Sequence, residues 1–204
     1  MVSDHTIWYG RRKPNHPITD HMERLDRSRW LDAAFDALCA TGWEAVRINP
    51  LCARLGVTKG SFYWHFESRE ALLLAMLAAW EGAGTEAIIA DVEGSRRPAG
   101  ERLRLLLHAV FAESPRNDRI EAAIRAWAAS DPAAAAAVAR VDERRLAYVR
   151  DLLQAAGASR AVATHRSAIL YRTLIGEFTW RSHGGPAITA KALEQLHGML
   201  LPDA

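Results

Sequence analysis

The sequence predicts an all-α protein. Apolar residues recur at helical spacing along most of the 204 residues, and no segment alternates apolar and polar residues as a half-buried strand does. Start and stop signals divide the chain into helices: Asp131 followed by Pro132 is a strong start, and Gly157 is a strong stop. A loop is expected at residues 183–186, where two glycines and a proline follow a histidine. We find no internal repeat.

The first part of the chain is expected to form four helices. The first covers about residues 22–40, has one apolar face and is closed by Gly42. Asn49 and Pro50 are typical of a cap followed by a first-turn proline, so they open the second helix. Thr58 is the predicted cap of a short third helix. Ser68 is the predicted cap of a fourth, which continues to about residue 91.

The remaining segments are one arm, one linker and a second group of helices. Residues 1–20 include Arg11, Arg12 and Lys13, contain two prolines and show no periodicity, so we expect a flexible basic arm. Residues 93–98 form the clearest linker. The helices expected after it cover about residues 99–113, 118–129, 132–156, 160–183 and 188–200.

Charge and composition restrict the class of protein only weakly. The net charge of +2 is too small to indicate a nucleic-acid binder by itself, although residues 42–69 hold four basic residues against two acidic ones. The chain opens without a charged and then apolar leader, and the apolar run at residues 71–80 is too short for a membrane span. We therefore expect a cytoplasmic protein with no membrane partner.

The two cysteines, Cys39 and Cys52, fit a reducing compartment and predict no disulfide framework. A thiol switch between them is one interpretation, but an inert pair of core residues is the preferred one.

The most informative segment is residues 55–66. Gly56 and Val57 predict a tight turn between two short helices, and Phe62 and Phe66 lie four residues apart, so that they can be buried together. Hydroxyl groups, a cation, a phenol and a glycine surround this pair. Those groups allow a helix to enter a DNA groove. The segment therefore predicts a helix-turn-helix.

The run over residues 42–66, together with residues 68–72, closely resembles the DNA-binding domain of the tetracycline-repressor (TetR) family. The resemblance covers roughly residues 27–80, and the ending of tyrosine, any residue, histidine and phenylalanine at residues 63–66 is its most specific part. It implies a DNA-binding domain at residues 21–68 and a helical ligand-binding and dimerisation domain at residues 69–204, joined by the fourth helix.

The resemblance also implies roles for single residues. Lys59, Tyr63 and His65 are expected to contact the phosphate backbone, with Trp64 packing beside them. Residues of the first turn are expected to meet base edges or thymine methyl groups. These first-turn residues are Thr58, Gly60 and Ser61.

The chain departs from the family pattern at Arg47, where the family usually has a threonine, and at Cys52, where it usually has an alanine. We favour a phosphate contact for Arg47 over a merely solvated side chain. The basic residues Arg11, Arg12 and Lys13 either enter the minor groove or belong to a solvated tail, and the tail is slightly favoured.

For the C-terminal part, the resemblance implies that the last two helices pair with a second subunit, and that a pocket binds a small molecule. The expected packing positions in the dimer are Ala168, Ile169, Ile175 and Gly176. The candidate pocket residues are His108, Phe111, Trp127, Tyr148, Tyr171 and Phe178, although ordinary helix packing is the preferred interpretation for each aromatic residue taken singly. An aromatic lining would favour an apolar or aromatic ligand.

The leading hypothesis is therefore a homodimeric transcriptional regulator, most simply a repressor, that binds a palindromic double-stranded DNA operator and is released by a small molecule. A ligandless dimeric DNA-binding protein and an enzyme with a DNA-binding head are the alternatives. Glycine-rich phosphate loops, nucleophile elbows and metal-ligand spacings are missing from the sequence. We thus expect no enzymatic activity, no cofactor and no metal site.

Overall fold

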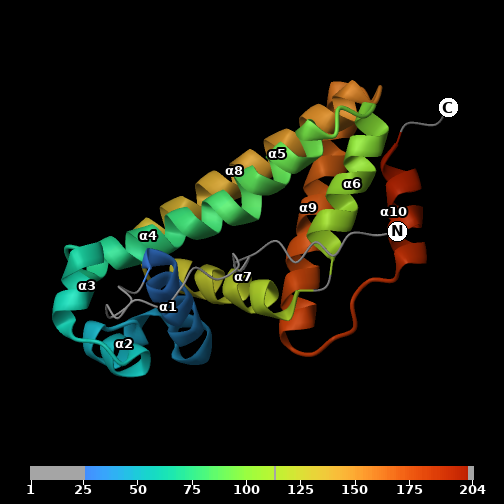
Figure 1. The fold of residues 1–204 in the computed structure, drawn as a ribbon. Helices are drawn as coiled ribbons and strands as arrows, with labels where there is room; N and C mark the ends of the chain where they lie inside the picture. Colours follow the sequence, from blue (N-terminus) through green and yellow to red (C-terminus); the bar gives the residue numbers. More distant parts are fainter. Residues whose placement is uncertain (1–25, 113, 202–204) are drawn as a thin grey trace, which may run out of the picture.

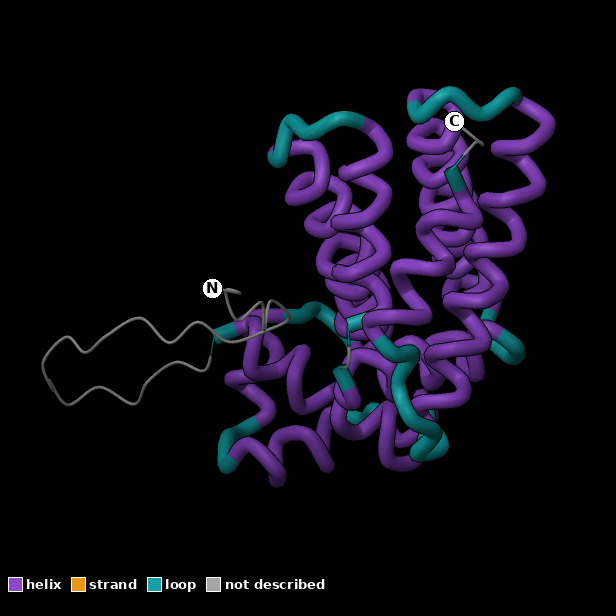
Figure 2. Tube along the Cα trace, turned by 90° about the vertical axis from the view of Figure 1, so that its right-hand side faces the viewer, coloured by secondary structure: helices purple, strands orange, loops and turns teal. Residues whose placement is uncertain are grey.

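The computed structural model describes residues 26–112 and 114–201, and every regular element in these ranges is helical. The predicted all-α class is confirmed (Figure 2). The arm at residues 1–20, with Arg11, Arg12 and Lys13, lies outside the described residues. The elements are α1 (Arg27–Thr41), η1 (Trp43–Ala45), α2 (Ile48–Leu55), α3 (Lys59–His65), α4 (Arg69–Glu81), η2 (Gly82–Glu86), α5 (Ala87–Gly94), α6 (Ala99–Phe111), α7 (Pro115–Ala128), α8 (Pro132–Ala155), α9 (Arg160–Ser182) and α10 (Ala190–Leu200).

Most of the predicted helix boundaries are confirmed within a few residues, but three starts are wrong. Helix α1 begins at Arg27 and not at about residue 22, because the extended residue Asp26 caps it. Helix α2 begins at Ile48 with the extended residue Arg47 as its cap, so Asn49 already lies inside the helix. Pro50 is compatible with this earlier start, because a first-turn N–H has no partner inside the helix. Helix α7 begins at Pro115, three residues before the expected start at 118, because Ser114 and Pro115 form its N-terminus.

A long continuous helix connects the two ends of the molecule. Helices α4 and α5 are joined without a break by η2, a single π-helical segment, and together they run diagonally across the molecule (Figure 1). Ser68 caps α4 as predicted, because its hydroxyl accepts a hydrogen bond from the Ala71 amide at 3.1 Å. The helix ends at Gly94, three residues beyond the expected end. The π-helical segment was not predicted.

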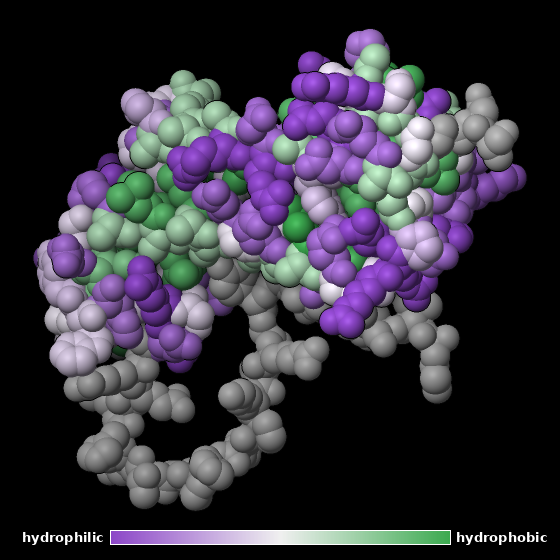
Figure 3. Space-filling view, turned by 90° about the horizontal axis from the view of Figure 1, so that it is seen from above, coloured by the Kyte–Doolittle hydropathy of each residue, from purple (hydrophilic) through white to green (hydrophobic). Residues whose placement is uncertain are grey.

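By length and apolar composition alone, Arg69–Gly94 would suffice to cross a membrane. A buried core helix passes the same test, and here one side of α4 is buried in the protein. The exposed side includes Leu74, which is 57% exposed. Figure 3 shows an apolar area of surface towards the end of the molecule that contains α3 and α4, flanked by polar areas.

Two apolar clusters form the interior. The first cluster unites the buried faces of α1 to α4 with α7 and the start of α8, and it includes Trp30, Phe62, Ile124 and Trp127. The second cluster joins α5, α6, the rest of α8, α9 and α10. The apolar interior therefore extends from the helix-turn-helix into α7 and α8, across the predicted domain boundary at residue 68, which stays a prediction.

Replacing Ile124 by alanine should show that α7 stabilises the helix-turn-helix. Ile124 is fully buried in the first cluster, so Ile124→Ala should lower the free energy of unfolding by about 3 kcal/mol, the typical cost of a buried cavity of this size. Urea denaturation measures the change. The exposed Leu74→Ala is the matched control and should change stability by less than about 0.5 kcal/mol. Equal losses in both variants would contradict this packing.

Candidate nucleic-acid interface

The turn between α2 and α3 has the geometry that the sequence predicts. Gly56 adopts a left-handed conformation with φ of 67°, which favours glycine, and ends α2. The Val57 amide then donates to the Cys52 carbonyl at 3.0 Å. Thr58 is the N-cap residue of α3, but its side chain makes no capping hydrogen bond. Cys52 is a free, buried thiol beneath this turn.

The inner face of α3 is held by aromatic packing. Phe62 and Phe66 are buried, as predicted, with ring centroids 5.6 Å apart. The Trp30 ring of α1 meets Phe62 edge-on at 5.4 Å. Because these contacts fix the rotation of α3 about its own axis, the remaining side chains of the helix are directed away from the core.

The outer face of α3 is exposed and rich in polar and aromatic groups. Tyr63 is 55% and Trp64 is 67% exposed, and Lys59 and Gly60 are exposed as well. Ser61 and His65 are half-buried at its edges. Large aromatic side chains at such exposure are typical of binding surfaces. The structure thus brings the predicted DNA-binding residues of α3 to one surface.

Arg47 is the N-cap residue of α2, the helix that precedes α3. Its side chain is exposed, and its Nε donates to the Glu44 carbonyl at 3.0 Å. The predicted phosphate contact of Arg47 stays a prediction.

Trp43 connects the helix-turn-helix to α7, and Arg69 of α4 holds the segment around Trp43 in place. Sequence reasoning missed both roles. The Arg69 guanidinium donates to the carbonyls of Val46 at 2.6 Å and Trp43 at 2.9 Å. The Trp43 ring stacks on Trp127 of α7, with centroids 5.9 Å apart. The Trp43 indole also donates to the Ser130 hydroxyl at 3.2 Å. The residue types of Trp43 and Trp127 favour an aromatic contact, but the sequence does not show that the two rings are partners.

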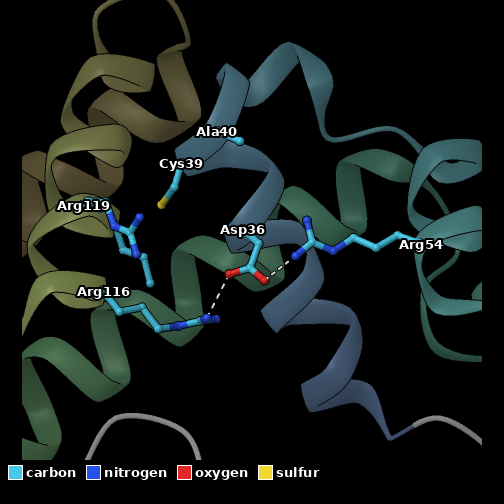
Figure 4. A pocket seen from close by; sticks show the side chains of 7 residues that line it. Asp36, Cys39, Ala40, Arg54, Arg116 and Arg119 are labelled. Atoms are coloured by element: carbon cyan, nitrogen blue, oxygen red, sulfur yellow. Dashed lines mark hydrogen bonds and ion pairs between the residues drawn. The ribbon is translucent and has the colours of Figure 1, made fainter.

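A second connection joins α1 to the other end of α7. Arg116 donates to Asp32 at 2.9 Å and to Asp36 at 2.8 Å, and Asp36 also accepts from Arg54 of α2 at 2.7 Å (Figure 4). Burial raises the pKa of Asp32, although Arg116 opposes this effect. The helix-turn-helix is therefore tied to α7 at both ends of that helix.

Comparison with known proteins shows which family the N-terminal part of the chain is similar to. A family model described as bacterial regulatory proteins of the tetR family matches residues 31–76. The class D tetracycline repressor protein of Escherichia coli is 36% identical over 55 residues, which are 27% of this chain and 25% of that protein. Residues 31–76 therefore match the tetR family of bacterial regulatory proteins. The HTH-type transcriptional repressor KstR of Rhodococcus jostii (strain RHA1) is 30% identical over 128 residues, which are 61% of this chain and 58% of KstR.

Solved structures share the fold beyond the DNA-binding domain. A transcriptional regulator from Rhodococcus sp. Rha1 superposes with a TM-score of 0.68 at 19% identity, over 85% of this chain and 94% of that chain. The transcriptional regulator FadR from Bacillus subtilis, solved in complex with stearoyl-CoA, gives 0.66 at 14% identity, over 86% and 98%. A regulator from Saccharomonospora viridis in complex with choline gives 0.66 at 16% identity, over 85% and 92%. At these identities the likeness shows a common fold. The chain aligns with a quarter of the class D repressor.

A buried carboxylate lies where the connecting helix meets the C-terminal helices. Glu121 of α7 is 4% exposed and accepts from the Trp80 indole of α4 at 2.9 Å. Arg125 donates to it at 2.9 Å and Arg145 of α8 at 3.1 Å. Burial alone would raise the pKa of Glu121, but Arg145 and Arg125 outweigh burial and hold the pKa below its ordinary value.

Arg145 connects this carboxylate to the π-helical segment. Its Nε donates to the Thr85 hydroxyl at 2.9 Å, and a terminal nitrogen donates to the Gly84 carbonyl at 3.2 Å. Its guanidinium also lies 5.5 Å from the centre of the Trp80 ring. A π-helical turn misaligns the backbone hydrogen bonds of a helix, so the side chain of Arg145 supplies a donor where the helix is irregular.

Arg125 extends the same network to α9. It donates to both oxygens of Asp142, at 2.7 Å and 3.2 Å, and the Tyr171 hydroxyl donates to Asp142 at 2.6 Å. Burial, together with the hydrogen bond to Asp142, raises the pKa of Tyr171 to about 12. The network therefore runs from α4 through α7 and α8 to α9, and sequence reasoning did not find it.

The predicted pocket residues are only partly brought together. Phe111, Tyr148, Tyr171 and Phe178 all belong to the second cluster. Trp127 instead lies in the first cluster against Trp43, so it is separated from the others. His108 is exposed on α6, with Nε2 2.9 Å from a Glu194 oxygen of α10. The predicted ligand pocket stays a prediction.

The predicted dimer positions lie on the outer side of α9. Ile169 is 64% exposed and Gly176 is exposed, while Ala168 and Ile175 are half-buried. Trp180 continues the same exposed side of the helix, and Met199 of α10 is also exposed. Exposed apolar side chains that gather on one side of a helix are typical of interaction surfaces. The dimer interface itself stays a prediction.

Removing the charge of Glu121 should lower the free energy of unfolding at pH 7 and make that free energy depend less on pH. In Glu121→Gln, Arg125 and Arg145 lose a buried countercharge, and the free energy of unfolding at pH 7 should fall by about 3 kcal/mol. Because the folded pKa is depressed, the contribution of Glu121 is complete above its unfolded pKa of about 4.3. It is lost as the pH falls through the folded value.

Urea denaturation at a series of pH values measures both effects. The variant should lose less stability than the wild type as the pH falls below about 4.3, because it has no proton to bind at this position. The exposed Glu143→Gln is the matched control and should keep the wild-type profile. If the free energy of unfolding fell equally in the wild type and in Glu121→Gln as the pH is lowered, the pairing of Glu121 with the two arginines would be contradicted.

Proposed function

We propose that the chain is a sequence-specific DNA-binding transcriptional regulator that acts as a homodimer. The observation that supports this most strongly is the outer face of α3, where exposed Tyr63 and Trp64 lie opposite a fully packed aromatic face. In a TetR-family domain, this helix is the one that enters the major groove. The family match at residues 31–76 includes all of α3.

The contacts divide into two kinds. Lys59, Tyr63 and His65 bind phosphates, with Trp64 beside them, and Arg47 reaches a further phosphate from the start of α2. Thr58, Gly60 and Ser61 lie at the N-terminus of α3, where a hydroxyl group or a closely approaching backbone reads base edges. Thr58 makes no capping hydrogen bond, so its hydroxyl is available for this purpose.

The dimer forms through the outer sides of α9 and α10, including Ala168, Ile169, Ile175 and Gly176. Exposed apolar side chains along α9 support this pairing. A two-fold dimer presents two α3 helices to two half-sites about 34–36 Å apart, so the operator is a rough palindrome of double-stranded DNA.

The regulator is a repressor that an apolar or aromatic small molecule releases from its operator. Both relatives described above are named as repressors, and two proteins of this fold were solved with choline and stearoyl-CoA. In this chain, the ligand is bound among Phe111, Tyr148, Tyr171 and Phe178 of the second cluster. We place the protein in the bacterial cytoplasm and assign it no enzymatic activity, cofactor or membrane partner.

The buried network supports a route from this ligand to DNA. A ligand that moves Tyr171 alters its hydrogen bond to Asp142, and Asp142 pairs with Arg125. Arg125 shares Glu121 with Arg145, which holds η2 in the connecting helix. A shift of α4 changes the spacing of the two α3 helices. By linkage, the ligand and DNA then weaken each other's binding by the same factor.

Fluorescence anisotropy with DNA from upstream of the gene, at two salt concentrations, tests DNA binding. Lys59→Ala removes one phosphate contact, so it should weaken binding on all sequences and reduce the salt slope by about 1. Tyr63→Phe should weaken binding through the loss of one hydroxyl group. Arg97→Ala removes an exposed charge between α5 and α6 and should leave the wild-type titration unchanged. If Lys59→Ala and Tyr63→Phe both kept the wild-type affinity for DNA and the wild-type salt slope, the proposal would be contradicted.

Gly60 offers a separate test of close approach to DNA. A Cβ at Gly60 would meet Thr58 Oγ1 at 3.6 Å, an ordinary contact, so the fold itself tolerates alanine there. Gly60→Ala should therefore keep or slightly raise the thermal stability, because alanine favours the helix. It should nevertheless weaken DNA binding about tenfold, since the added methyl group keeps the backbone from the groove. Unchanged DNA affinity would show that no close approach occurs at this position.

A further inference from the structure

A polar hollow of about 350 Å³ lies between α1, α2 and α7, away from the second apolar cluster (Figure 4). Helix α7 contributes Arg116, Arg119 and Ile120, α1 contributes Asp36 and Cys39, and Arg54 reaches it from α2. Its volume falls at the lower end of the range for small-molecule sites. None of the contacts proposed for DNA or for the dimer uses Arg116, Arg119 or Cys39.

The hollow holds more positive than negative charge. Both oxygens of Asp36 are engaged, one by Arg54 at 2.7 Å and the other by Arg116 at 2.8 Å. Arg116 also pairs with the neighbouring Asp32 at 2.9 Å. Among the described residues, three guanidinium groups thus face two carboxylates, so one positive charge there has no countercharge.

That surplus charge belongs to Arg119. Its Nε donates to the Pro115 carbonyl at 3.2 Å, which orients the guanidinium on the surface of α7. Within the described part of the chain, no hydrogen bond or ion pair is assigned to its two terminal nitrogens. A guanidinium held by Nε presents those nitrogens as a planar pair of donors, which matches the two oxygens of a carboxylate or a phosphate.

The rest of the lining is apolar. Ile120 is buried, Ala40 and the half-buried Cys39 lie beside it, and Figure 4 shows the Cys39 sulfur directed towards the arginines of α7. A ligand with an anionic group and a short hydrocarbon portion matches both parts of the hollow. A bare inorganic ion would leave the apolar part unused.

We propose that this hollow is a second ligand site, which binds a small organic anion through Arg119 and Arg116, with its hydrocarbon portion against Ile120, Ala40 and Cys39. An anion bound there competes with Asp36 and Asp32 for Arg116. The ion pairs of Arg116 join α1 to α7, so occupancy of the site weakens one of the two connections between the helix-turn-helix and α7. This effector site is separate from the pocket proposed in the second cluster.

Protection of Cys39 from alkylation reports on the site without any need for DNA. The full-length protein is treated with iodoacetamide, a neutral reagent, at constant ionic strength, and Cys39 alkylation is followed by peptide mass spectrometry. The probe is phenyl phosphate, compared with inorganic phosphate and with the uncharged benzyl alcohol. Phenyl phosphate should slow Cys39 alkylation to a saturating limit, inorganic phosphate should do so only at higher concentration, and benzyl alcohol should have little effect.

Variants locate the effect. Arg119→Gln should raise the concentration of phenyl phosphate needed for half-protection about tenfold, as expected for one charge-assisted contact, while Arg119→Lys should keep part of the protection. Arg97→Gln removes an exposed charge elsewhere and should behave as the wild type. Rates are compared with and without probe for each variant, which removes any effect of the substitution on the thiol itself. No protection, or equal protection by benzyl alcohol or in Arg119→Gln, would overturn the proposal.

Discussion

The position of the connecting helix depends on one buried charge, the carboxylate of Glu121. A carboxylate that is 4% exposed is stable only when cations surround it, and here Arg145 and Arg125 both do so. Each arginine is fixed in turn by partners on another element, Thr85 in η2 for Arg145 and Asp142 in α8 for Arg125. The connecting helix, α7, α8 and α9 therefore meet at a single charge and move relative to one another only if these pairs rearrange.

Helix α7 fixes the position of α3 relative to this buried carboxylate. Its inner side contains Glu121 and Arg125, while its other side contacts α1 and η1 through Arg116 and Trp127. The helix-turn-helix thus rests on α7 at two points and continues into α4 at a third. Because the buried side chains of Phe62 and Phe66 fix the rotation of α3 about its axis, its outer face has one orientation relative to the C-terminal helices.

Local features of the chain were predictable, and long-range polar pairs were not. The α2–α3 turn, the buried pair Phe62 and Phe66 and the cap at Ser68 each depend on residues within a few positions of one another. The contacts of the π-helical segment and of Glu121 join residues up to 61 positions apart, and no spacing in the sequence predicts them. Trp127 shows the same limit, because its type indicated an aromatic contact but not that Trp43 would be the partner.

The central claim is that two copies of the chain place their α3 helices in successive major grooves on one face of DNA. Random-site selection with the full-length protein, followed by hydroxyl-radical footprinting of the selected DNA, tests it most directly. The account predicts two symmetric protected patches on the same face of the duplex, with centres about 34–36 Å apart. A single uninterrupted patch, or patches on opposite faces of the duplex, would contradict it.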